Sequence, residues 1–109
     1  MMDTKTEIAE TLREVATAAE ERWVKLYLET IESTTSYYER DRVYAMLLSA
    51  REAYRAARRD GDILGDMRIS VMNQKAAWVL YPTAEKEGRF EGLQNILDAV
   101  DAKLYGDAR

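Results

Sequence analysis

The middle of the chain holds a cluster of like charges at a regular spacing. The cluster, here called the arginine stripe, consists of Arg51, Arg55, Arg58 and Arg59. The spacing i, i+4, i+7, i+8 places all four on one side of a helix. Guanidinium groups pair with phosphates, and Tyr54 lies alongside to stack on a base. The stripe therefore predicts contact with a polyanion, although a solvated helix end whose arginines pair with nearby acids has the same pattern.

Acidic residues form two patterns that could bind a metal ion. Four glutamates in the first part of the chain lie at helical spacing: Glu7, Glu10, Glu14 and Glu21. Carboxylate sites in helical bundles usually include a Glu-x-x-His unit, and this chain has no histidine. Residues 60–66 begin like a calcium-binding loop, but Leu64 and Val71 occupy ligand positions 5 and 12. We therefore expect a solvated helix face, a helix-joining loop and no metal.

Histidine and cysteine are both absent from the sequence. Their absence removes the commonest general base, the commonest metal ligand and all thiol chemistry. It excludes Ser-His-Asp and Cys-His nucleophilic sites, disulfides and nearly all zinc sites. We expect a protein that is not an enzyme and that uses no cofactor.

Most of the aromatic residues carry a polar group: there are seven tyrosines and two tryptophans but only one phenylalanine. Tyrosine and tryptophan combine a large contact area with a polar tip, which suits a surface that is buried against a partner. Around residues 20–32 the apolar residues also cover most of the helix circumference. The predicted protein interface consists of Trp23, Val24, Tyr27, Leu28, Ile31, Tyr37 and Tyr38. The same aromatic residues could instead cover the edges of a small core.

Helix signals account for most of the chain. Thr4 with Glu7, and Ser36 with Glu39, have the spacing of capping boxes, and apolar residues then recur every three or four positions. These signals predict two long antiparallel helices, at about 5–33 and 37–60.

Two shorter helices are expected at about 66–81 and 89–105. Asp66 is the expected cap of the first of these, and Pro82 ends it. A separate short turn at 82–87 ends at Gly88, and Gly106 ends the last helix. The predicted fold is an all-α bundle of about four helices, with residues 1–109 as a single domain whose ends, 1–5 and 106–109, fray.

Charge and hydropathy bound the location and the partners. The net charge is −4, and no stretch approaches the roughly 20 apolar residues of a membrane span. Without a secretory signal, a cytoplasmic location is expected, bacterial or in the host of a virus. A core rich in alanine must bring its helices close together or bury further surface against a partner.

The sequence predicts a non-enzymatic protein–protein interaction module that self-associates and contacts no membrane. Phage-encoded assembly factors and inhibitors of host defence include small acidic helical proteins without Cys or His. The likeness is one of size and composition alone, and no motif carries it. The alternative is a nucleic-acid accessory protein that uses the arginine stripe.

Overall fold

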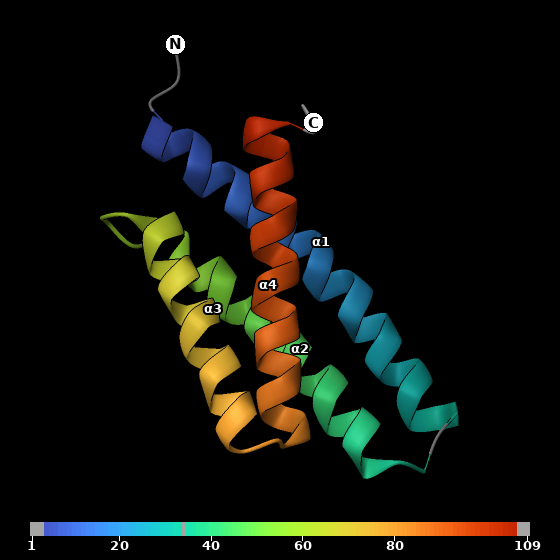
Figure 1. Ribbon diagram of the computed structural model, residues 1–109. Coiled ribbons are helices and arrows are strands. Elements are labelled where there is room, and N and C mark those ends of the chain that lie inside the picture. Colours follow the sequence, from blue (N-terminus) through green and yellow to red (C-terminus); the bar gives the residue numbers. More distant parts are fainter. Residues whose placement is uncertain (1–3, 34, 107–109) are drawn as a thin grey trace.

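The computed structural model describes residues 4–33 and 35–106, and its secondary structure within those ranges is entirely helical (Figure 1). The helices are α1 (Thr4–Ser33), α2 (Tyr37–Ala56), α3 (Ile63–Leu80) and α4 (Ala84–Tyr105). They alternate in direction and pack into a bundle that measures 51 × 30 × 29 Å. The predicted fold class, an all-α bundle of four helices, is confirmed.

The last helix, α4, is the centre of the bundle. In Figure 1 it crosses in front of α2, with α3 on its left and the lower half of α1 on its right. The contact between α2 and α4 is the most extensive, α1 packs mainly on α2, and α3 packs mainly on α4. Because α1 and α3 scarcely touch, much of the circumference of α3 lies on the surface.

The contact between α2 and α4 depends on small residues. A Cβ atom added to Gly88 would lie 2.1 Å from the carbonyl oxygen of Arg42 and 2.8 Å from the Cβ atom of Ala45. A Cβ atom added to Gly92 would lie 2.8 Å from the Cβ atom of Ser49. The Ser49 hydroxyl donates to the Arg89 carbonyl oxygen at 3.2 Å across the same contact. Two glycines one turn apart on α4 therefore let the two backbones approach, as the alanine-rich composition led us to expect.

Five small and medium residues of the core are completely buried: Leu12, Ala16, Val43, Ala50 and Val100. Larger core side chains include Trp23 of α1 and Met46 of α2. Alanines such as Ala50 and Ala53 fill much of the remaining space. The small residues among them let the helices lie close to one another.

The boundary of α3 differs from the predicted one. Asp62 rather than Asp66 is the cap, since its Oδ1 atom accepts from the backbone N–H of Gly65 at 3.0 Å. The helix consequently begins at Ile63, three residues earlier than predicted. α2 ends at Ala56, about four residues before the predicted end at 60. The link to α3 passes through Gly61, whose φ of +107° favours glycine.

The predicted break at Gly88 is wrong. The hydroxyl of Thr83 caps α4 by accepting from the N–H of Lys86 at 3.3 Å, and the helix continues through Gly88 to Tyr105. Gly88 is buried against α2, so its role is close packing and not termination. α4 is therefore 22 residues long, more than the 20 of α2.

The helix ends expected at Ser36 and Gly106 agree with the structure. The Ser36 hydroxyl accepts from the N–H of Glu39 at 3.3 Å and caps α2, and Gly106, with φ of +72°, caps α4. Of the ends expected to fray, Thr4 and Lys5 lie in α1, whereas 1–3 and 107–109 lie outside the described residues. Within the described ranges, no helix combines the length and the apolar character that a bilayer span requires.

Candidate functional site

The structure divides the predicted protein interface between core and surface. Trp23 is only 3% exposed and packs in the core, so it leaves the predicted interface. Val24 and Tyr27 are half-buried, while Leu28 and Ile31 are exposed. These four residues, here called the α1 face, share one side of the helix because they are spaced i, i+3, i+4 and i+7.

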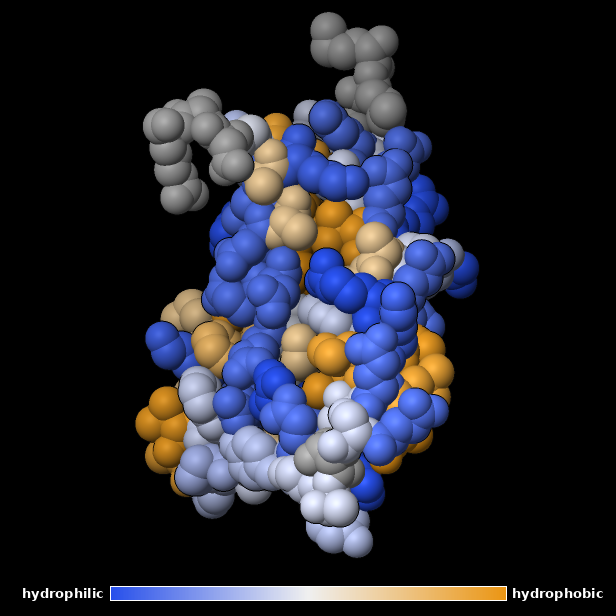
Figure 2. Space-filling view, turned by 90° about the vertical axis from the view of Figure 1, so that its right-hand side faces the viewer, coloured by the Kyte–Doolittle hydropathy of each residue, from blue (hydrophilic) through white to orange (hydrophobic). Residues whose placement is uncertain are grey.

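The side of the bundle on the right of Figure 1 has a mostly polar surface. Figure 2 shows mostly hydrophilic side chains on this side. Hydrophobic atoms appear in the furrow between the ridges and at the two lower edges. The apolar surface on this side is therefore broken up by polar residues.

The two predicted tyrosines of α2 face different neighbours. Tyr37 is 77% exposed, and its ring lies 5.6 Å from the guanidinium carbon of Arg40. Tyr38 instead donates a hydrogen bond to Glu87 of α4. Tyr44, which the sequence analysis did not include, packs its ring 5.4 Å from that of Tyr27 and extends the α1 face onto α2.

A polar cluster around Arg42 joins the starts of α2 and α4. Arg42 donates from Nη2 to Glu39 and from Nη1 to Glu91, each at 2.5 Å. With Tyr38 and Glu87 these residues form the Arg42 cluster. Its carboxylates come from both α2 and α4. Arg42 and Glu91 are 49 positions apart in the sequence. No local spacing in the sequence could have indicated this pairing.

Hydrogen bonding and burial shift the ionisation of the Arg42 cluster. The hydrogen bond to Glu87 raises the pKa of Tyr38 above its ordinary 10.0. The hydrogen bond from Arg42 lowers the pKa of Glu39, and the same contact raises the pKa of Arg42. Burial raises the pKa of Glu91 despite the opposing attraction of Arg42. The cluster therefore acts as a bridge between helices whose strength depends on pH.

The arginine stripe is less uniform than its spacing suggests. Arg51 pairs with Glu20 of α1 at 3.4 Å, while Arg55 is exposed on the last turn of α2. Arg58 and Arg59 follow the end of the helix, and Arg58 lies over the ring of Tyr54 at 5.4 Å. The four guanidinium groups are thus in different surroundings.

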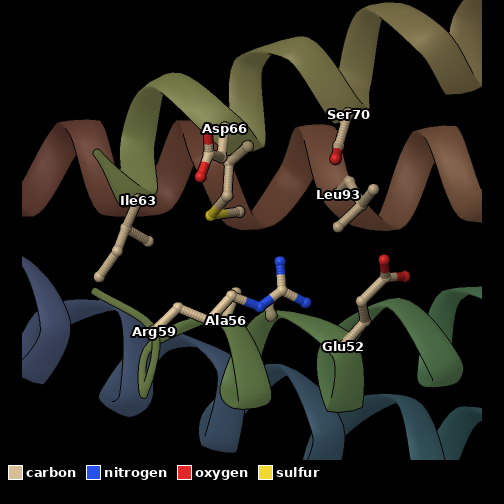
Figure 3. A pocket seen from close by; sticks show the side chains of 9 residues that line it. Glu52, Ala56, Arg59, Ile63, Asp66, Ser70 and Leu93 are labelled. Carbon is tan, nitrogen blue, oxygen red and sulfur yellow. The ribbon is translucent and has the colours of Figure 1, made fainter. Parts of the chain in front are cut away.

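Arg59 extends into a gap between α2 and α3 (Figure 3). Asp66 and Ser70 project into this gap from α3, Glu52 lines it from α2, and Leu93 of α4 forms part of its wall. The enclosed space is about 30 Å³, on the order of the volume of one water molecule. The gap therefore suits a solvated set of mixed charges.

The acidic residues considered as metal ligands do not converge. Glu14 lies 3.7 Å from Lys103 of α4, and Asp62 serves as a helix cap. Within 4–33 and 35–106, no three acidic side chains gather as a metal ion would require. The arrangement of the four glutamates fits the solvated face that was the simpler interpretation.

The most exposed apolar helix surface is on α3, which the sequence analysis missed. Ile69, Met72, Ala76, Val79 and Leu80 are all exposed, and together they are called the α3 outer face. The opposite side of the helix packs on the core through residues that include Met67 and Val71. The steps of three, four and three from Ile69 to Val79 are a second heptad pattern, and that pattern was the available signal.

The two apolar faces and the Arg42 cluster are the features of this structure from which a function can be argued. Comparisons of the chain with protein-family models, with curated protein sequences and with solved structures gave no match.

Proposed function

We propose that this chain is a non-enzymatic protein-interaction module that self-associates. A phage-type assembly factor or an inhibitor of a host system would use such a module. The supporting observation is the gathering of exposed large apolar side chains on two helices, in the α1 face and the α3 outer face. Removing apolar surface from water contributes about 25 cal/mol of favourable free energy per Å². Monomeric proteins rarely leave a large contiguous apolar patch exposed.

Light scattering coupled to size-exclusion chromatography tests this proposal. At tens of micromolar, the chain is expected to elute with at least twice the mass of the monomer. A strict monomer throughout that concentration range would overturn the self-association.

The surface predicted from the sequence comprises Trp23, the four residues of the α1 face, Tyr37 and Tyr38. If that surface mediates association, Tyr27→Ala and Tyr37→Ala should each shift the equilibrium toward monomer. Tyr105→Ala is a matched control, because Tyr105 is an exposed tyrosine on another helix, α4. Unchanged association in both test variants would remove this surface from the proposal.

The alternative function is nucleic-acid binding through the arginine stripe. One observation favours it, namely the exposed Arg58 over the half-buried ring of Tyr54, a pair that could contact a phosphate and a base together. The pairing of Arg51 with Glu20 and the acidity of α1 weigh against it. A low-salt gel shift that weakens in an Arg55→Ala, Arg58→Ala variant would support this alternative, and no shift would exclude it.

A further inference from the structure

The helix α3 is apolar on two opposite sides. Its inner side packs on α4, where Trp78 stacks on Phe90 with ring centroids 5.7 Å apart. Its outer side leaves Ile69 58%, Met72 69%, Val79 70% and Leu80 72% exposed. A helix with two apolar sides is normally covered on both, and the described part of this chain covers only one.

The outer residues have the spacing of a helix-pairing surface. Ile69, Met72, Ala76 and Val79 occupy positions equivalent to a, d, a and d of a heptad. These positions bring side chains toward a parallel or antiparallel partner helix, and not toward a flat surface.

The nearest cations on α3, Arg68 and Lys75, flank this face, and each of them contacts α4. Arg68 donates two hydrogen bonds to Asp101, at 3.2 Å and 3.0 Å. The Nζ atom of Lys75 lies 6.0 Å from the centroid of the Phe90 ring. The α3 outer face is therefore an uncharged strip, and it offers no charge for an ionic partner to recognise.

We propose that the α3 outer face pairs with the same face of a second copy of this chain, with the two α3 helices antiparallel. A two-fold axis level with Gln74 would place Ile69 against Val79 of the second copy and Met72 against Ala76 of the second copy. Each layer then combines a larger with a smaller side chain. A parallel pair would instead set Met72 against Met72 and Ala76 against Ala76, which overfills one layer and leaves a void in the next.

The area of this face suits a dimer of moderate affinity. Its four large side chains are 58–72% exposed, which together with Ala76 gives an area on the order of a few hundred Å², within the roughly 300–600 Å² of the largest exposed patch of an ordinary monomer. Two such faces together would bury roughly 600–1,200 Å², which spans the approximately 1,000 Å² expected of a specific interface. This inference rests on the proposed self-association and names the surface that causes it.

The α1 face is a weaker candidate for the same contact. Val24 and Tyr27 are half-buried there, and Tyr27 is already engaged with Tyr44. Less apolar area would be removed from water per residue than on α3. The two surfaces thus predict opposite outcomes for matched variants.

The first experiment compares two double variants with the wild type by light scattering. Met72→Asp with Val79→Asp places charges in the α3 outer face and should yield a monomer. Leu28→Asp with Ile31→Asp places the same charges in the α1 face and should leave the dimer intact. Circular dichroism and thermal melting check that both variants fold, as expected for substitutions at exposed positions.

A dimeric α3 variant would overturn the surface assignment, although the self-association of the wild type would stand. A monomeric wild type would overturn both.

The second experiment measures orientation without disrupting the face. Because the chain has no cysteine, Ile69→Cys and Val79→Cys introduce single reactive thiols. In the antiparallel pair, two copies of residue 69 lie about 15 Å apart along the helix, at 1.5 Å per residue, whereas residues 69 and 79 are level. A short bifunctional thiol cross-linker should therefore link the mixed variants and leave each variant alone unlinked.

Efficient cross-linking of either variant with itself would overturn the antiparallel arrangement. Failure of the mixture to cross-link would overturn the pairing of these faces.

Discussion

Trp23 and Leu28 show how neighbouring apolar residues on one helix serve different purposes. Trp23 lies in the core against helices packed on α1, while Leu28 is 52% exposed. We expect Trp23→Ala to lower the free energy of unfolding by about 3–5 kcal/mol. Leu28→Ala should change it by no more than about 0.5 kcal/mol. Urea unfolding followed by circular dichroism measures both, and similar losses in the two variants would contradict the assignment of core and surface.

The sequence could not separate these two residues. Between Trp23 and Ile31, apolar residues occupy positions around most of the helix, so helical periodicity alone does not identify the buried side. The partners decide it, because α2 and α4 cover one side of α1 and leave the other in water.

Tyr38 predicts a stability effect at alkaline pH. Its pKa is raised in the folded state by the hydrogen bond to Glu87, so its contribution is present below the unfolded pKa of about 10. The contribution is lost as the pH rises through the higher folded pKa. Tyr38→Phe should therefore be less stable than the wild type at a pH of about 8, and the difference should vanish above the folded pKa.

Urea unfolding across that range measures the difference. Tyr37→Phe is the matched control, because it removes a neighbouring hydroxyl that is more exposed. A constant difference between Tyr38→Phe and wild type at every pH would contradict the role of the Tyr38 hydroxyl.

In acid, by contrast, the Arg42 cluster has opposing effects. The lowered pKa of Glu39 gives stability above the unfolded pKa, which is lost as the pH falls through the folded value. The raised pKa of Glu91 gives a contribution that is present below its unfolded pKa and is lost as the pH rises. The two contributions partly cancel near the ordinary pKa of glutamate, which is why the alkaline range isolates a single group.

At the scale of helices, the glycines of α4 set the distance to α2. Replacing Gly88 by alanine gains about 1 kcal/mol of helix propensity, but its Cβ atom would meet the backbone of Arg42 at 2.1 Å. Overpacking of this kind costs about 1–3 kcal/mol or more, and backbone cannot move aside as a side chain can. We expect Gly88→Ala to lower the free energy of unfolding by about 1–2 kcal/mol, measured by urea denaturation.

Gly92→Ala is a useful control, because the side chain that its Cβ atom would meet can itself be removed by substitution. Its Cβ atom would meet the side chain of Ser49, so Ser49→Gly should recover part of the loss in a double-mutant cycle. Ser49→Gly should give no such recovery in Gly88→Ala, whose contact is with Arg42 and Ala45. Stabilisation by Gly88→Ala would show that propensity outweighs packing at this contact.

Helix boundaries were predictable where a local pattern determines them and unpredictable where the partner helix does. Ser36 was predicted correctly as a cap because a capping box is a local pattern. Asp62 and Asp66 are equivalent as caps on local grounds, and the structure selects Asp62, from which Ile63 and Leu64 enter the core. Gly88 was predicted to end a turn because a glycine that ends a helix and one that permits close packing look identical without the partner helix.

At the scale of the whole molecule, the arrangement around α4 determines which apolar faces remain uncovered. The sequence indicated more apolar surface than one small bundle can bury and assigned it to α1. The structure packs α1 on α2 and α4, whereas α3 packs mainly on α4. The excess is therefore greatest on α3, and the number of neighbours that each helix has is a property of topology that periodicity does not contain.

A dimer formed through α3 makes stability depend on concentration. Unfolding of a dimer to two separate chains is opposed by mass action, so each tenfold increase in concentration adds about 0.7 kcal/mol per chain. For a domain of this size, each tenfold increase should raise the melting temperature by about 3–5 °C, as long as the protein concentration exceeds the dissociation constant of the dimer. The Met72→Asp, Val79→Asp variant should melt at one temperature at every concentration. A wild type that behaves in the same way would show that no second copy of the chain covers the α3 outer face, which would overturn the proposed dimer.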